Sequence, residues 1–83
     1  MYKLIKTKVT KQNEISVNTT TIATNLTFIE AATIVNQHAR VTKPQWLLEA
    51  LPELFLIDTN LNRPCYQKVT DEVYDYLYRI EEI

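Results

Sequence analysis

Side chains suited to catalysis or metal binding are sparse in this chain of 83 residues, which has one histidine, His38, and one cysteine, Cys65. A structural zinc site needs four such ligands. A Cys65–His38 pair would be a nucleophile with its base, but nothing in the residues around them supports that role. The chain has no glycine, so no glycine-rich loop can hold phosphates. We therefore expect no enzymatic activity and no catalytic, cofactor-binding or metal site.

Tyrosines and acids gather near the end of the chain and form the first candidate binding site. Trp and Tyr are enriched where protein interfaces gain most of their energy. If "TDEVYDYLYRIEEI" (70–83) is a helix, two tyrosines four residues apart lie beside an acidic face. We predict a protein-binding surface made of Asp71, Tyr74, Asp75, Tyr78 and Glu82.

Basic residues gather in the other half of the chain. The first 46 residues carry six Lys or Arg and two acids, whereas the rest carry three Lys or Arg and eight acids. This segregation predicts a dipolar surface with one basic end. If the partner is a nucleic acid, we expect its phosphates to contact Lys3, Lys6, Lys8, Lys11, Arg63 and Lys68.

The first half of the chain predicts a β-hairpin followed by a helix. Residues 2–9 and 14–24 interleave polar with apolar and β-branched side chains, as paired antiparallel strands do. Thr27 and Glu30 form a capping box at the start of the helix over 28–40. Without glycine, turns that need positive φ are expected at asparagines, and the candidates are Asn13, Asn25, Asn60 and Asn62.

The second half predicts a short helix, a short hairpin and a final helix. Thr42 begins the short helix, which runs to about Leu51 with Pro44 in its first turn. The apolar run 54–57 predicts a buried strand, and 65–69 predicts its return strand. Thr70 caps the final amphipathic helix. The expected fold is therefore one α+β domain over residues 1–83, with an N-terminal antiparallel β-hairpin, two central helices, a second short β-hairpin and a C-terminal amphipathic helix.

The short helix is apolar around most of its circumference, and its only polar stripe is Gln45, Glu49 and Glu53. A helix that reads DNA presents donors and cations to bases and phosphates. A carboxylate about 4 Å from a phosphate costs on the order of 1 kcal/mol in water. We therefore expect Trp46 and its leucine neighbours to be hidden from solvent, in the core or at the centre of a protein interface.

One stretch resembles a known family. "LTFIEAA" (26–32) resembles the start of excisionase-like and MerR-like winged helix-turn-helix domains, and "TDEVYDYL" is similar to the helix that closes them. The resemblance covers residues 26 to about 78 and implies DNA contacts from the helix around 42–49 and from a wing with Asn62, Arg63 and Lys68. The family's usual turn glycine is absent, and the N-terminal hairpin lies outside that module.

Two functions follow as hypotheses. The first is non-catalytic binding of a protein partner, because the composition and short length resemble small accessory proteins of phages or mobile elements, many of which inhibit a host protein. The alternative is a DNA-binding winged helix-turn-helix regulator. Self-association through the hairpin edge or the short helix is a third possibility, which makes a homo-oligomer another expected state.

Composition also predicts where the protein works. A single cysteine fits a reducing compartment. No apolar run approaches the roughly 18 residues that a membrane span needs, and the basic start lacks the apolar stretch of a signal peptide. We expect a cytoplasmic protein without a membrane partner.

Overall fold

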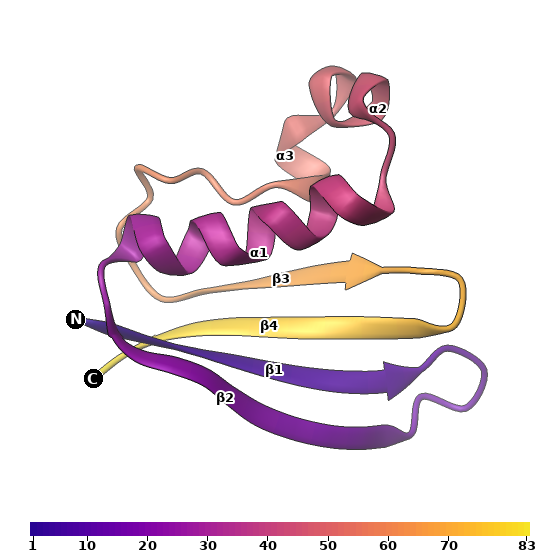
Figure 1. The fold of residues 1–83 in the computed structure, drawn as a ribbon, viewed down its shortest axis with the longest axis horizontal. Coiled ribbons are helices and arrows are strands. Elements are labelled where there is room, and N and C mark those ends of the chain that lie inside the picture. Colours follow the sequence, from indigo (N-terminus) through magenta and orange to yellow (C-terminus); the bar gives the residue numbers. More distant parts are fainter.

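The computed structural model describes residues 1–83 and contains one four-stranded antiparallel sheet with three helices (Figure 1). The strand order is β2-β1-β4-β3, so the first and last strands are neighbours in the middle of the sheet and the two termini lie together. In chain order the elements are β1 (Tyr2–Thr10), β2 (Ser16–Leu26), α1 (Phe28–Thr42), α2 (Gln45–Ala50), α3 (Pro52–Phe55), β3 (Cys65–Thr70) and β4 (Tyr74–Glu82).

The predicted N-terminal hairpin and first helix are confirmed. β1 and β2 pair antiparallel, with register shifts at three points. At the start of α1, the Glu30 N–H donates to Thr27 Oγ1 over 3.1 Å and the Thr27 N–H donates to Glu30 Oε1 over 2.9 Å. This capping box satisfies two backbone donors that would otherwise lack partners at the helix start.

Positive φ angles occur at three residues, Glu14, Asn25 and Asn62. The predictions for Asn25 and Asn62 are confirmed, since asparagine tolerates this region better than most residues. In the β1–β2 turn, however, the position is taken by Glu14 (φ 52°) and not by Asn13.

The predicted C-terminal helix is wrong, because residues 74–82 form strand β4. β4 pairs with β1 on one side and with β3 on the other. Asp71 does not start a helix: its Oδ1 accepts from the N–H groups of Val73 and Tyr74, and its own N–H donates to the Tyr74 carbonyl. These bonds close the β3–β4 turn. The hydrogen bonds to the carboxylate also hold the pKa of Asp71 below its usual value. The bond from the Tyr74 N–H has the larger effect, and the bond from the Val73 N–H has the next largest.

The predicted strand at 54–57 is also wrong. Pro52 begins the single-turn helix α3, which ends at Phe55. Ile57 is buried beyond it, while Leu54 is exposed. The return strand predicted at 65–69 exists as β3, but its partner is β4. The second hairpin is therefore β3–β4, and β1 and β4 join it to the first hairpin in one sheet.

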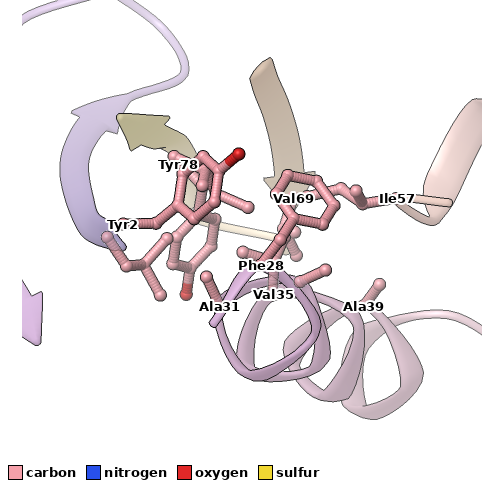
Figure 2. Close-up of a cluster of buried hydrophobic side chains, with 11 residues drawn as sticks. Tyr2, Phe28, Ala31, Val35, Ala39, Ile57, Val69 and Tyr78 are labelled. Atoms are coloured by element: carbon pink, nitrogen blue, oxygen red, sulfur yellow. The ribbon is translucent and has the colours of Figure 1, made fainter. Parts of the chain in front are cut away.

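The core lies between α1 and one face of the sheet (Figure 2). Three alanines of α1 are buried against the strands, and small side chains let the helix lie close to them. The Tyr2 ring packs edge-on against Phe28, with 5.4 Å between centroids, and its hydroxyl donates to the Asn62 carbonyl. The core comprises Tyr2, Leu4, Phe28, Ala31, Ala32, Val35, Ala39, Ile57, Val69, Tyr78 and Ile80.

On the face of the sheet opposite α1, Tyr66 of β3 and Leu77 of β4 are exposed. Among the helices, none is both long enough and apolar enough to span a membrane.

Candidate functional site

Trp46 is exposed, so the expectation that it lies in the core is wrong, and burial at a protein interface stays a prediction. Its exposed fraction is 68%, whereas that of Leu48 in the same helix is 3%. At about 100° per residue, the two side chains point to nearly opposite sides of α2. Leu48 is therefore the buried residue of α2, although it lies outside the main core cluster, and Trp46 points away from it.

An apolar arc runs around α2 from Leu48 to Trp46. On the helical wheel, Leu51, Leu47 and Ala50 fill the angles between these two residues. Leu51 and Ala50 are exposed and Leu47 is half-buried. Leu54, in α3, is 60% exposed. We call Trp46, Leu47, Ala50, Leu51 and Leu54 the α2–α3 apolar surface.

Three polar contacts position α3 and the segments beside it. Asn36 in α1 is buried and forms two hydrogen bonds with the backbone of Ile57, donating from Nδ2 to the carbonyl and accepting the N–H at Oδ1. Gln67 in β3 donates to the Leu54 carbonyl over 3.3 Å. Lys43 donates to Thr70 Oγ1 over 3.0 Å. Figure 1 shows that α2 and α3 lie beyond α1, on the side away from β1 and β2.

A hollow of about 210 Å³ opens beside Leu54 and Phe55, between α1, α3 and β3. Ala39 and Val69 supply apolar atoms to its lining, and Lys43 supplies a charge at 5.9 Å from the centroid of the Phe55 ring. The α2–α3 apolar surface is therefore next to a cavity that has room for a side chain.

A second candidate site combines lysines with tyrosines. In the sheet, Lys6 lies opposite Tyr78 and Lys8 opposite Tyr76, on the face that carries α1. The Lys8 ammonium is 4.0 Å from the centroid of the Tyr74 ring, and the Lys6 ammonium is 5.6 Å from that of Tyr76. Such contacts attract a cation to the face of a ring.

Lys11 and His38 complete this second site. Lys11, in the β1–β2 turn, donates to the backbone carbonyl of Asp71 over 2.9 Å. His38 of α1 packs edge-on against Tyr76, with 4.6 Å between the ring centroids. We call Lys6, Lys8, Lys11, His38, Tyr74 and Tyr76 the lysine–tyrosine surface.

His38 and Tyr78 share a hydrogen bond of 2.6 Å between Nδ1 and Oη. Burial, and after it the charge of Lys6, lowers the pKa of His38. Burial raises the pKa of the Tyr78 phenol. Both groups are therefore neutral near pH 7, and the positive charge of the lysine–tyrosine surface comes from its lysines.

The residues predicted to bind a protein do not form one exposed surface, because β4 alternates its side chains between the two faces of the sheet. Tyr78 is buried at 5% exposure, and Tyr74 is half-buried beneath Lys8. Asp71 closes a turn. Asp75 lies on the opposite face, and its buried Oδ1 has no hydrogen-bond partner. Glu82 is exposed at the end of β4.

The predicted nucleic-acid contacts are also divided. Lys6, Lys8 and Lys11 come together, but Lys3 points to the opposite face, where it pairs with Glu81 over 3.8 Å. Lys68 is exposed on that same opposite face, across from Leu77. Arg63 is exposed in the loop before β3. The winged-helix resemblance implies a β-hairpin wing, but those residues form α3, a loop and β3. It also implies a closing helix, but those residues lead into and form strand β4.

Cys65 and His38 are not hydrogen-bonded to each other. Cys65 lies opposite Ile80 in the sheet, whereas His38 bonds to Tyr78. Burial raises the pKa of the Cys65 thiol, although the nearby Arg63 opposes this, so the thiol stays protonated near pH 7. No group of three or more His, Cys, Asp or Glu side chains converges anywhere in the structure.

Comparison with known proteins found no match for this chain among family models, curated proteins or solved structures.

Proposed function

We propose that this chain is a non-catalytic protein-binding domain and that the α2–α3 apolar surface is where the partner binds. The exposed Trp46 is the observation that carries the proposal. Tryptophan dominates the energy of many protein interfaces, and contiguous exposed apolar side chains mark interaction sites. Here the exposed indole lies on the side of α2 opposite the buried Leu48.

The size and border of this surface indicate the kind of partner. Fully burying a large apolar side chain contributes about 1.5–3 kcal/mol, so Trp46 and Leu54 are together worth about 3–6 kcal/mol. Glu49 and Glu53, both exposed, lie beside the apolar residues. A matching partner presents an apolar groove with Lys or Arg at its edge. The proposal includes the narrower hypothesis drawn from composition. In that hypothesis the chain is a phage or mobile-element protein that inhibits a host protein in the cytoplasm.

Trp46 is the only tryptophan of the chain, so its fluorescence reports on the proposed site. In the free protein, we expect acrylamide to quench it nearly as well as in the unfolded chain, because the indole is exposed. With a partner bound, quenching should fall and the emission should move to shorter wavelength. An indole already protected in the free protein contradicts the exposed surface on which the proposal depends.

Paired variants test the contact itself. Trp46→Ser with Leu54→Ser removes two exposed apolar side chains from the proposed site, and Ile29→Ser with Val41→Ser removes two others that are also exposed, from α1. Tagged proteins are used for capture from nuclease-treated lysate of the source organism. We expect the first pair to lose a partner that the wild type and the second pair retain. Equal capture by both pairs, with folding checked by circular dichroism, contradicts the proposal.

A further inference from the structure

The lysines of the lysine–tyrosine surface form no ion pair, although Asp71 and Glu72 line the same hollow as Lys11. The two ion pairs of the structure join Lys3 and Arg79 to Glu81, and residues 3, 79 and 81 lie on the opposite face of the sheet. Lys6 and Lys8 form no ion pair, and Lys11 bonds to a neutral backbone carbonyl. Three cations are thus held on one side of the molecule, and one carboxylate, that of Asp71, lies close to both Tyr76 and His38.

The aromatic rings restrain these cations without removing their charge. A ring face attracts an ammonium through its quadrupole and carries no net charge. Lys8 lies over Tyr74 and Lys6 over Tyr76, so an anion that binds here meets side chains that are already ordered. Prior ordering lowers the entropy cost of binding.

The arrangement suits a linear chain of negative charges. Lys6 and Lys8 are two residues apart on one strand, so their side chains emerge on the same face about 7 Å apart. Lys11 extends the row at the turn. Asn18 and Thr20, which are exposed and lie opposite Lys8 and Lys6 in β2, add uncharged hydrogen-bonding groups along its side.

The chemistry of the surface distinguishes between classes of partner. Its apolar neighbours Leu4, Tyr78 and Ile80 are buried under α1, so it offers cations and polar groups with little apolar contact. Interfaces with nucleic acid are more polar and more positive than those between proteins. A single strand, whose backbone can follow a row of cations, suits this surface, whereas reading a duplex needs an element that enters a groove.

From these observations we propose that the lysine–tyrosine surface binds the phosphate backbone of a single-stranded nucleic acid. This surface is separate from the α2–α3 apolar surface, and the proposal does not rest on the protein-binding function. It keeps the nucleic-acid hypothesis but assigns it to Lys6, Lys8 and Lys11 alone among the six basic residues first considered.

Fluorescence anisotropy with a labelled single-stranded oligonucleotide about 12 nucleotides long tests the proposal. Lys6→Gln with Lys8→Gln should weaken binding roughly thirtyfold at low salt, if each contact is worth about 1 kcal/mol. Each phosphate contact contributes about −0.7 to the slope of log K against log salt concentration. The slope should therefore fall in magnitude by about 1.4 in this variant.

The matched control is Lys3→Gln with Lys68→Gln, which changes the net charge by the same amount on the opposite face. It should bind nearly as well as the wild type and keep its salt slope. The proposal is overturned if the wild type does not bind at about 50 mM salt, if the two double variants lose equal affinity, or if an oligoglutamate of equal charge binds as tightly. Tighter binding of a duplex of the same sequence would also overturn it. Thermal unfolding shows whether each variant is folded.

Discussion

Replacing Asn36 with alanine should destabilise this protein strongly. The Asn36 side chain is 4% exposed and forms hydrogen bonds of 3.0 Å and 2.8 Å with the carbonyl and N–H of Ile57, which is 7% exposed. Alanine removes both bonds and leaves two backbone groups buried without partners. Each such group costs about 1–3 kcal/mol, so we expect a loss of about 3 kcal/mol. For a domain of this size, 1 kcal/mol corresponds to about 4–8 °C, and the Tm should fall by about 12–24 °C.

Thermal and urea unfolding followed by circular dichroism measure this change. Gln37→Ala is the control, because this neighbouring side chain is exposed and such substitutions change stability by about 0.5 kcal/mol or less. Asn36→Asp keeps the size but replaces the donor with an oxygen that faces the Ile57 carbonyl, so it should be at least as destabilising near pH 7. If Asn36→Ala and Gln37→Ala unfold at the same temperature, the segment after α3 is not held to α1 as described.

Two further predictions concern α1. Thr27→Ala removes the capping box and should cost about 1 kcal/mol, seen as a Tm about 4–8 °C lower, while Thr27→Ser should restore most of it; an unchanged Tm for Thr27→Ala would show that the cap contributes nothing. Burial of His38, and after it the charge of Lys6, lowers the pKa of His38 in the folded state below the unfolded value of 6.5. The stability that the neutral His38 contributes to the fold is therefore fully present above pH 6.5 and is lost as the pH falls through the folded-state pKa. Urea midpoints should therefore drop between about pH 7.5 and pH 5.5 in the wild type and less in His38→Gln, and equal drops would contradict this.

The first half of the fold was predictable because its signals are local. The capping box of Thr27 and Glu30 sets the start of α1, and alternation over β1 and β2 predicts the hairpin. The tolerance of asparagine for positive φ correctly predicted two of the three positions that have it, Asn25 and Asn62. The buried Asn36 was missed, since its partner Ile57 is 21 residues away and no local pattern connects them.

The prediction of a helix at the C-terminal strand is wrong because the sequence there fits both the 3.6-residue period of a helix and the two-residue period of a strand. Val73, Leu77 and Ile80 fit one face of a helix, but Tyr74, Tyr76, Tyr78 and Ile80 also alternate with Asp75, Leu77, Arg79 and Glu81 as in a strand. Tyrosine favours strands, and β4 gains a neighbour on each side. Helical spacing placed Tyr74 and Tyr78 beside the acids, whereas the strand places Tyr74 and Tyr76 beside the lysines of β1. The lysine–tyrosine surface therefore depended on strand pairing that the sequence alone did not specify.

The exposure of Trp46 also bears on stability. Only 14 of the 83 residues are buried, and small domains have small net stabilities, commonly near the lower end of about 5–15 kcal/mol. Leaving Trp46 and Leu54 in water forgoes burial energy of similar size to that net stability. A partner that covers them should therefore stabilise the fold as well, by about 2.7 kcal/mol when its free concentration is about 100 times Kd. Because the Asn36–Ile57 bonds hold the residue that follows the α2–α3 segment to α1, this stabilisation should reach the core, and Asn36→Ala should weaken it.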